Sequence, residues 1–341
     1  QGFDLPEDGS AIKSKTNQLV VYNNVLIDEA ARSCPPDLII PIACAKKRII
    51  MVGDHRQLPQ FVNDEVLEAV DVEADVKKEM KDVSVFEYLI GTTEKLSSND
   101  DFRRFIALNQ QYRMPKILGD FIGDNFYPEL SLGSPRGNPC DDPGFVQTFP
   151  VIANKCMVWC DVPYGRESKV DNRGWKNVEE AIIVGKLLNS FLNDESNSQM
   201  SIGVISFYRD QVAEIKNQLL NYNIYVKDED GMRVNDSYKS RLNIDTVDAF
   251  QGLERDIIIL SMVRSDPSRK FKRGSFGFLQ DERHLCVALS RQKKCLVVVG
   301  NGSGMLQTNV ANSSVAALAD YYRRCKKGGE YIEYVEAKDI H

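Results

Sequence analysis

The sequence of 341 residues predicts an α/β protein with parallel sheets in two successive domains. Apolar runs of strand length end in polar tips, and segments with helical spacing join one run to the next. Parallel strands need such crossovers, because a tight hairpin joins only antiparallel neighbours. The alternation occurs near the start of the chain and again after residue 155, which predicts two α/β domains that meet at a cleft.

The first expected domain, residues 1–108, contains two strands and two helices. The strands are expected at 18–28 and 47–54, with helix-like sequence around 35–45 between them. The run SVFEYLI at 84–90 is typical of a packed helix. The order strand, helix, strand indicates a parallel pair.

The second expected domain, residues 109–330, repeats this pattern over a longer stretch and is followed by a C-terminal tail at 331–341. Residues 128–145 are rich in turn-forming residues and are expected to form an irregular surface loop. Strands are expected at 155–162, 200–207, 243–250, 256–263 and 294–300. Helices are expected at 177–192, 208–222, 284–292 and 313–329.

The composition is that of an ordinary soluble globular protein, with 43% hydrophobic and 27% charged residues. No stretch approaches the roughly 18 consecutive apolar residues that a membrane helix needs, so no membrane association is expected. The sequence has eight cysteines but no C-x-x-C pair, and only three histidines, which argues against a zinc site. Free thiols in a reducing cytoplasm or nucleus are the expectation, and therefore an intracellular protein.

The net charge of −6 argues weakly against a protein that binds nucleic acid by electrostatics alone. Residues 1–105 carry 13 basic and 19 acidic groups, whereas the rest of the chain carries 30 of each. The excess of acid therefore belongs to the front of the chain, and the neutral remainder can still form a basic groove.

Two strands of the first domain are followed by carboxylate or amide side chains. The strand in YNNVLIDEAARS ends in Asp28 and Glu29, and VGDHRQLPQ places Gln57 shortly after the next strand. In nucleotide hydrolases an acid at a strand tip holds Mg²⁺, and a neighbouring acid polarises the attacking water. A glutamine at the position of Gln57 could reach both a γ-phosphate and that water.

Three later segments add groups that suit a phosphate and a base. In NQQYRMP, Arg113 can clamp phosphate oxygens and Tyr112 can stack on a base. In TVDAFQGLERDIIIL, Gly252 permits a tight turn or a close backbone approach beside Glu254. In VALSRQKK, Arg291 is expected on a short helix, where it could act as an arginine finger.

These five segments resemble, in order, motifs II, III, IV, V and VI of superfamily 1 helicases. The resemblance is strongest to the 5′-to-3′ branch that includes the nonsense-mediated-decay helicases and senataxin, and it covers nearly all of residues 18–301. No segment alone is specific, but their order and joint presence are.

The resemblance implies two RecA-like domains with ATP in the cleft between them, and the first domain is incomplete here. Asp28 would then hold Mg²⁺, Glu29 would activate water and Gln57 would sense the γ-phosphate. Arg113 and Arg291 would contact that phosphate from the second domain. The resemblance further implies nucleotide contacts at Tyr112, Gly252 and Glu254, and contacts with single-stranded RNA or DNA at Ser206, Tyr208 and Thr246.

The phosphate-binding loop G-x-x-x-x-G-K-[ST] does not occur anywhere in the 341 residues. One explanation is that the chain is the C-terminal part of a larger helicase whose upstream part carries that loop. The other is a degenerate helicase-like module that binds nucleic acid or a protein partner without hydrolysis. Both predict that the isolated chain lacks substantial ATPase activity, and the residues do not distinguish RNA from DNA.

Overall fold

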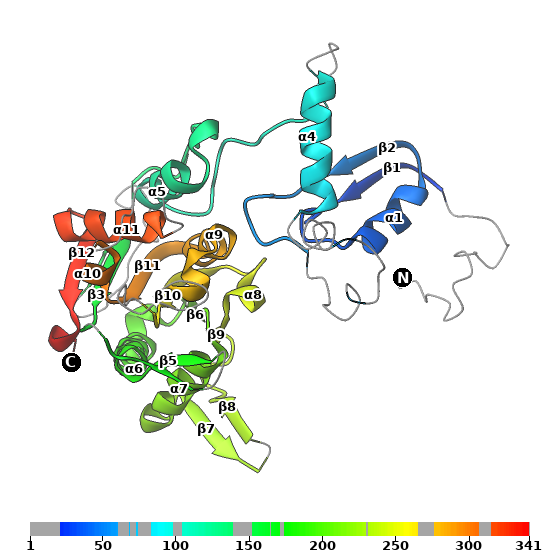
Figure 1. The fold of residues 1–341 in the computed structure, drawn as a ribbon. Helices are drawn as coiled ribbons and strands as arrows, with labels where there is room; N and C mark the ends of the chain where they lie inside the picture. Colours follow the sequence, from blue (N-terminus) through cyan, green and yellow to red (C-terminus); the bar gives the residue numbers. More distant parts are fainter. Residues whose placement is uncertain are drawn as a thin grey trace. The chain divides into compact units, whose positions relative to one another are not determined.

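The computed structural model describes residues 21–60, 68, 73, 83–97, 104–138, 152–163, 165–170, 174–229, 231–264, 276–306 and 315–340. The chain divides into two compact units, here called unit 1 (residues 1–106) and unit 2 (residues 107–341) (Figure 1). Each unit contains parallel strands and helices, so the predicted α/β class with parallel sheets is confirmed.

Unit 1 is built on a pair of parallel strands, β1 (Tyr22–Ile27) and β2 (Ala45–Met51). Helix α1 (Pro35–Ala43) connects them, and its two leading prolines suit a first turn, where the missing N–H groups lose no hydrogen bond. Helix α4 (Val85–Ser97) follows. The small core joins these elements through the side chains of Ile27, Ala30, Ala31, Leu38 and Phe86.

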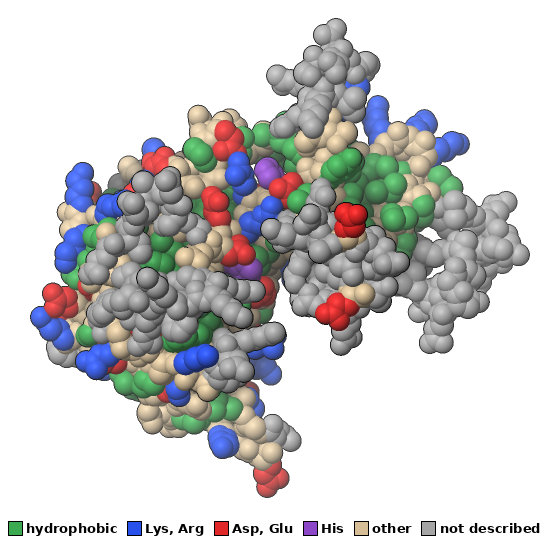
Figure 2. Space-filling view, viewed as in Figure 1, with side chains coloured by type: hydrophobic (Ala, Val, Ile, Leu, Met, Phe, Trp, Pro, Cys, Tyr) green, Lys and Arg blue, Asp and Glu red, His purple; other side chains and the backbone are tan. Residues whose placement is uncertain are grey.

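The two-stranded sheet of unit 1 leaves much apolar surface exposed. Leu26 of β1 is 68% exposed and Ile50 of β2 is 49% exposed, although both lie in strands of high apolar content. Figure 2 shows this apolar surface over β1, β2 and α1. Parallel strands are normally covered on both faces, and the apolar carboxyl-terminal halves of β1 (VLI) and β2 (IIM) are typical of such interior strands.

Unit 2 is organised around a six-stranded sheet in which all neighbouring strands are parallel, in the order β12-β3-β11-β10-β6-β9. The strands are β3 (Met157–Asp161), β6 (Ile202–Ser206), β9 (Leu242–Thr246), β10 (Arg255–Ser261), β11 (Gln292–Gly300) and β12 (Ile332–Glu336). Two small antiparallel hairpins lie outside the sheet, β4 (Glu167–Lys169) with β5 (Trp175–Asn177), and β7 (Tyr225–Asp228) with β8 (Gly231–Val234).

Helices cover both faces of this sheet (Figure 1). On one face, α6 (Val178–Asn193) and α7 (Arg209–Leu219) pack on alternate strand residues such as Val204, Ile259 and Val297. On the other face, Phe121 of α5 (Lys116–Phe126) meets Tyr321 of α11 (Ala316–Lys327) edge to face at 5.1 Å between ring centroids. The Tyr321 hydroxyl donates to the Leu296 carbonyl of β11, which ties α11 to the sheet.

Short helices complete unit 2 around the ends of the strands. The α-helices are α8 (Val247–Phe250), α9 (Glu282–Leu289) and α10 (Gly302–Leu306). The 3-10 turns are η1 (Pro128–Leu130), η3 (Glu195–Asn197), η4 (Leu220–Tyr222), η5 (Gly277–Gln280) and η7 (Ala337–Asp339).

Two segments of unit 2 differ from the sequence-based expectation. The strand expected at 243–250 ends at Thr246, and the following four residues form α8. Thr246 pairs with Ser206, the last residue of β6, so the partner strand does not continue beyond this point. The tail expected at 331–341 contains strand β12, which pairs with β3 along the edge of the sheet. β12 carries two glutamates among its five residues, and charged side chains suit an edge strand.

Candidate active site residues in the two units

The two predicted acids of unit 1 lie immediately beyond the carboxyl end of β1. Asp28 and Glu29 are both exposed, and the Asp28 carboxylate accepts a hydrogen bond from the Glu29 amide at 2.9 Å. Glu29 has a φ of 52°, a left-handed conformation that is uncommon for a residue other than glycine. This turn directs the chain away from the strand and leaves both carboxylates at its tip.

The loop after β2 lies against the same turn. Val52 donates to the Ile27 carbonyl at 2.8 Å, and Ala30 donates to the Val52 carbonyl at 2.9 Å, so the two strand tips stay paired. A Cβ added to Gly53 would lie 2.9 Å from the Ala31 amide nitrogen, which explains why this close approach has a glycine.

Gln57 is held within this loop by its neighbour Asp54. The Gln57 side-chain amide donates to Asp54 Oδ2 at 2.7 Å, and the Arg56 amide donates to Asp54 Oδ1 at 3.0 Å. Asp28, Glu29 and Gln57 therefore lie along one edge of the β1–β2 sheet, because parallel strands end at the same edge.

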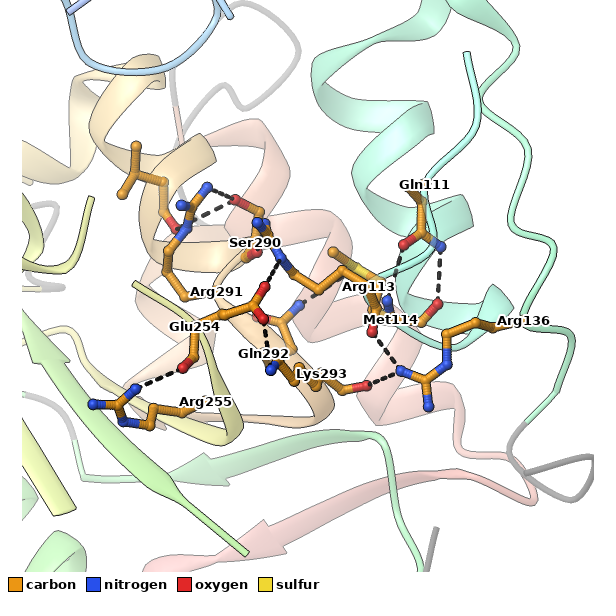
Figure 3. Close-up of polar contacts among 11 residues, drawn as sticks. Gln111, Arg113, Met114, Arg136, Glu254, Arg255, Ser290, Arg291, Gln292 and Lys293 are labelled. Atoms are coloured by element: carbon orange, nitrogen blue, oxygen red, sulfur yellow. Dashed lines mark hydrogen bonds and ion pairs between the residues drawn. The ribbon is translucent and has the colours of Figure 1, made fainter. Parts of the chain in front are cut away.

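In unit 2, Arg113 connects segments that are far apart in the sequence (Figure 3). Its Nε donates to Glu254 at 3.0 Å, and its Nη1 donates to the Ser290 carbonyl at 2.8 Å. Glu254 also forms an ion pair with Lys293 at 2.5 Å. Lys293 and Arg113 together hold the pKa of Glu254 below its usual range, so this carboxylate is ionised at neutral pH.

Arg291 lies beyond the end of α9, between Ser290 and the first residue of β11, rather than on the helix that the sequence predicted. The side chain is 2% exposed. Its Nε donates to the Val287 carbonyl at 3.1 Å and its Nη2 donates to the Ser290 hydroxyl at 2.8 Å. The cation thus lies at the carboxyl end of α9, where the helix dipole favours positive charge.

The structure brings both predicted arginines of unit 2 to one residue, Ser290 (Figure 3). Arg113 binds its carbonyl and Arg291 binds its hydroxyl. We call Arg113, Glu254, Ser290, Arg291 and Lys293 the arginine cluster. It unites three of the sequence segments that were singled out separately.

Two supporting residues of the arginine cluster were missed by sequence analysis. Gln111 accepts from the Met114 amide and donates to the Met114 carbonyl, both at 2.9 Å, which closes the loop around Arg113. Arg136 donates to the carbonyls of Arg113 and Lys293. Gln111 belongs to the segment NQQYRMP, but the sequence assigned it no role. Arg136 is a single arginine in the turn-rich residues 128–145, where no sequence pattern predicts a function for it.

Two more predicted nucleotide contacts occupy turns of unit 2. Tyr112 is 66% exposed, and its hydroxyl donates to the Gln110 side chain at 2.8 Å. Gly252 has a φ of 80°, which a residue with a side chain rarely adopts, so the expected tight turn before Glu254 does need a glycine.

The three predicted nucleic-acid contacts lie at or just beyond the carboxyl ends of β6 and β9. Ser206 and Thr246 are partners in the parallel register. Ser206 is buried, and its hydroxyl donates to the Ser261 carbonyl of β10. Tyr208 is also buried, with its ring 5.6 Å from that of Phe278. Of the three, only Thr246 is partly exposed. The other two side chains are buried and can support this edge of the sheet but are not exposed to a ligand.

A buried acid that the sequence did not reveal lies at this edge. Glu180 of α6 accepts hydrogen bonds from the Ser261 hydroxyl at 2.7 Å and from the Val263 amide at 2.9 Å. Burial raises the pKa of Glu180 to about 8 despite these donors. Val263 has a φ of 68°, a rare conformation for a β-branched residue, which Glu180 helps to fix. Arg264 then stacks 4.6 Å from the centre of the Trp175 ring.

Comparison with known families gives two matches, both to models described as AAA domain. One covers residues 82–303 and includes the segments of Arg113, Glu254 and Arg291. The other covers residues 9–65 and includes the segments of Asp28 and Gln57.

Of three similar curated proteins, two are named as helicases. The chain is 30% identical to the ATP-dependent helicase NAM7 of Saccharomyces cerevisiae over 85% of its own length and 26% of the relative. It is 32% identical to the regulator of nonsense transcripts 1 homolog of Neurospora crassa, over 82% of the chain and 22% of the relative. It is 27% identical to the helicase SEN1 of Saccharomyces cerevisiae, over 89% and 12% respectively. The chain thus spans about a quarter or less of these relatives.

Two kinds of feature are absent from the described ranges. None of the helices there is long and apolar enough to cross a membrane. The same residues contain no group of three or more His, Cys, Asp or Glu side chains arranged to hold a metal ion.

Proposed function

Since this chain belongs to the superfamily 1 helicases that carry these AAA domains, we propose that it forms the later part of an ATP-driven motor. The motor would move 5′-to-3′ along single-stranded RNA or DNA. The observation that carries the proposal is the arginine cluster, in which two guanidinium groups from distant segments meet at Ser290. Two convergent cations suit the terminal phosphate of a nucleotide.

The proposed catalytic step uses residues of both units. Glu29 accepts a proton from the attacking water, and Gln57 orients that water. Arg113 and Arg291 stabilise the charge that develops on the transferred phosphoryl group. Because Arg291 is 2% exposed, its side chain must swing outward from Val287 and Ser290 to act as a finger. Tyr112 is exposed and can stack on the adenine, and its neighbour Arg113 binds Glu254, which follows the turn of Gly252.

The residues of unit 1 fit a magnesium–ATP complex in part. Mg²⁺ commonly takes one or two protein carboxylates and completes its shell with phosphate oxygens and water, and Asp28 is exposed at a strand tip for that purpose. The ion, when bound, neutralises phosphate charge during transfer. Backbone amides for the phosphates must come from a loop that this sequence lacks.

We propose that an upstream part of the same polypeptide supplies that loop. The chain spans about a quarter or less of its relatives, and β1 and β2 expose apolar side chains such as Leu26 and Ile50. Additional parallel strands and helices from upstream would cover these side chains and complete the sheet of unit 1. We call this longer product the full-length polypeptide, and we place it inside the cell, in the cytoplasm or nucleus.

The nucleic-acid strand is proposed to run past the carboxyl ends of β6 and β9. Thr246 offers a hydroxyl there, while its amide donates to Asp245. Ser206 and Tyr208 are buried and support the strand ends through contacts with Ser261 and Phe278. Contacts of this kind address the sugar–phosphate backbone, so we expect little sequence preference and a strong dependence of affinity on salt.

The test measures ATP hydrolysis by the full-length polypeptide with and without matched RNA and DNA single strands. We expect stimulation by at least one of the two, and no substantial turnover by the 341-residue chain alone. Robust turnover by the chain alone would contradict the need for an upstream loop. Failure of both strands to stimulate the full-length polypeptide would overturn the motor, and nucleotide-independent binding would then favour a degenerate binding module.

A further inference from the structure

A histidine in the first turn of α9 lies between two aspartates from different elements. The Nδ1 of His284 is 2.9 Å from Asp281, the N-cap residue of α9, and its Nε2 is 3.4 Å from Asp248 of α8. The His284 side chain is 20% exposed. Asp281 also accepts the amides of Arg283 and His284, so the same carboxylate starts the helix and faces the imidazole.

The surroundings favour the charged form of this imidazole. Burial alone lowers the pKa of His284, but the hydrogen bonds and charges of Asp248 and Asp281 outweigh burial and raise it to about 9. The hydrogen bond from His284 in turn lowers the pKa of Asp248. His284 is therefore an imidazolium at neutral pH, held by two carboxylates.

Among the described residues, few other charged or titratable groups face this bridge. Arg209 of α7 adds a positive charge that also lowers the pKa of Asp248. On the side of η5, the Phe278 ring lies 6.3 Å from the imidazole. On the side of α5, the Cys286 sulfur of α9 lies 3.3 Å from the hydroxyl oxygen of Tyr127. Asp248 and Asp281 thus dominate the electrostatics of His284.

The two joined helices lead to opposite sides of the arginine cluster. Helix α8 begins after Thr246 and is followed by the turn to Glu254. Helix α9 ends directly before Ser290 and Arg291, and the Val287 carbonyl in its last turn accepts from Arg291. A shift of α9 against α8 would therefore separate Ser290 from Glu254, and Arg113 binds both.

We propose that His284 is a positioning residue for hydrolysis, because its charged bridge between Asp248 and Asp281 locks α9 against α8. This inference rests on the proposed motor function. The bridge keeps the guanidinium groups of the arginine cluster in a fixed position relative to the strand ends that are proposed to face nucleic acid. A neutral imidazole would weaken the bridge and loosen the cluster.

The main test compares three variants of the full-length polypeptide in strand-stimulated ATP hydrolysis from about pH 6.5 to about pH 10. His284→Gln removes the charge, and His284→Arg keeps a cation that does not titrate. Arg233→Gln is the matched control, because Arg233 also bridges two aspartates, Asp228 and Asp236, but on an exposed hairpin. Thermal unfolding at the lowest pH verifies that each variant is folded.

We expect His284→Gln to lower kcat about tenfold with little change in KM for ATP, since a small displacement of catalytic groups acts on the transition state. The wild-type rate should fall as the pH rises through about 9, whereas His284→Arg should retain its rate there. Arg233→Gln should match the wild type. An unchanged kcat in His284→Gln, or the same alkaline fall in His284→Arg, would overturn the positioning role. Absence of hydrolysis in the wild type would instead refute the motor function itself.

A second measurement uses the 341-residue chain directly and does not depend on hydrolysis. An NMR titration follows the imidazole of His284, identified among three histidines by its disappearance in His284→Gln. We expect a midpoint near 9. A midpoint near the ordinary value of about 6.5 would show that the bridge is not formed in solution.

Discussion

The acids of unit 1 and the arginines of unit 2 differ in how firmly the protein holds them. Asp28 and Glu29 are exposed side chains on a single turn. Arg113 and Arg291 instead lie in a network of charge-assisted hydrogen bonds with Glu254 and Ser290. The comparison indicates that unit 2 fixes its proposed phosphate-binding groups through its own fold, whereas unit 1 presents its two carboxylates at a strand tip with few fixed contacts.

The two sheets show the same contrast at the level of packing. Ile259 in β10 of unit 2 is fully buried, whereas Ile50 in β2 of unit 1 is 49% exposed, although both lie in apolar parallel strands. Strand sequence alone therefore does not determine burial, which depends on the number of neighbouring strands and covering helices.

Removal of Arg291 gives the largest expected effect. In the full-length polypeptide, Arg291→Ala should reduce ATP hydrolysis by roughly 10³-fold or more if the residue acts as a finger, because it stabilises charge only during transfer. Steady-state kinetics measure the loss, with Arg233→Ala as the control at an exposed ion pair. Turnover within a few-fold of the wild type would remove Arg291 from the chemistry and leave it as a structural cation.

Neutralisation of Glu29 should have the next largest effect. Glu29→Gln keeps the shape of the exposed side chain but removes the base, so hydrolysis should fall by roughly 10²- to 10⁴-fold while ATP binding persists. A fluorescent nucleotide titration beside the kinetics separates the two properties. If Glu29→Gln loses ATP binding as well as turnover, this acid contacts the nucleotide or its metal ion and does not activate the water.

A pair of strand substitutions, one buried and one half exposed, tests the packing contrast in the 341-residue chain. Ile259→Ala should lower the free energy of unfolding of unit 2 by about 2–5 kcal/mol. Ile50→Ala should lower that of unit 1 by less than about 1 kcal/mol, because its side chain is half exposed. Hydrogen exchange of the amides in each sheet reports the two units separately.

The same two substitutions in the full-length polypeptide test whether upstream strands cover β2. If upstream strands cover β2, Ile50→Ala should become about as costly there as Ile259→Ala. An equally small cost in both contexts would show that the apolar surface of unit 1 remains uncovered.

A further expected effect, on stability and not on activity, is a pH dependence of unit 2. The folded-state pKa of Glu180, about 8, lies above its unfolded value, so the folded state retains a proton between the two values. The contribution of Glu180 to stability is therefore complete at low pH and is lost as the pH rises towards 8. Glu180→Gln should flatten this part of the profile of unfolding temperature against pH, and an unchanged slope would contradict the burial argument.

The sequence predicted most of the parallel strands because their apolar runs are long and end in polar tips. It failed for β12, because this five-residue edge strand contains two glutamates and no long apolar run. It extended β9 through α8, because VDAF is as suitable for a strand as for one helical turn.

The candidate site divides in the same way. Arg113, Glu254 and Arg291 were named separately from short segments, and the fold of unit 2 brings them together. Arg136 and His284 could not be found, because their partners lie far away in the sequence or depend on where a helix begins. Sequence patterns thus identify chemical groups, while long-range pairing determines which of them act together.

The central claim is that Asp28 from one unit and Arg113 and Arg291 from the other act on the same terminal phosphate. The most direct measurement is a structure of the full-length polypeptide with Mg²⁺, ADP and aluminium fluoride, which mimics the phosphoryl group in transfer. We expect both guanidinium groups to donate hydrogen bonds to the fluoride, with Asp28 beside the metal ion. Arginines that stay on Glu254 and Val287, away from an occupied nucleotide, would contradict the account.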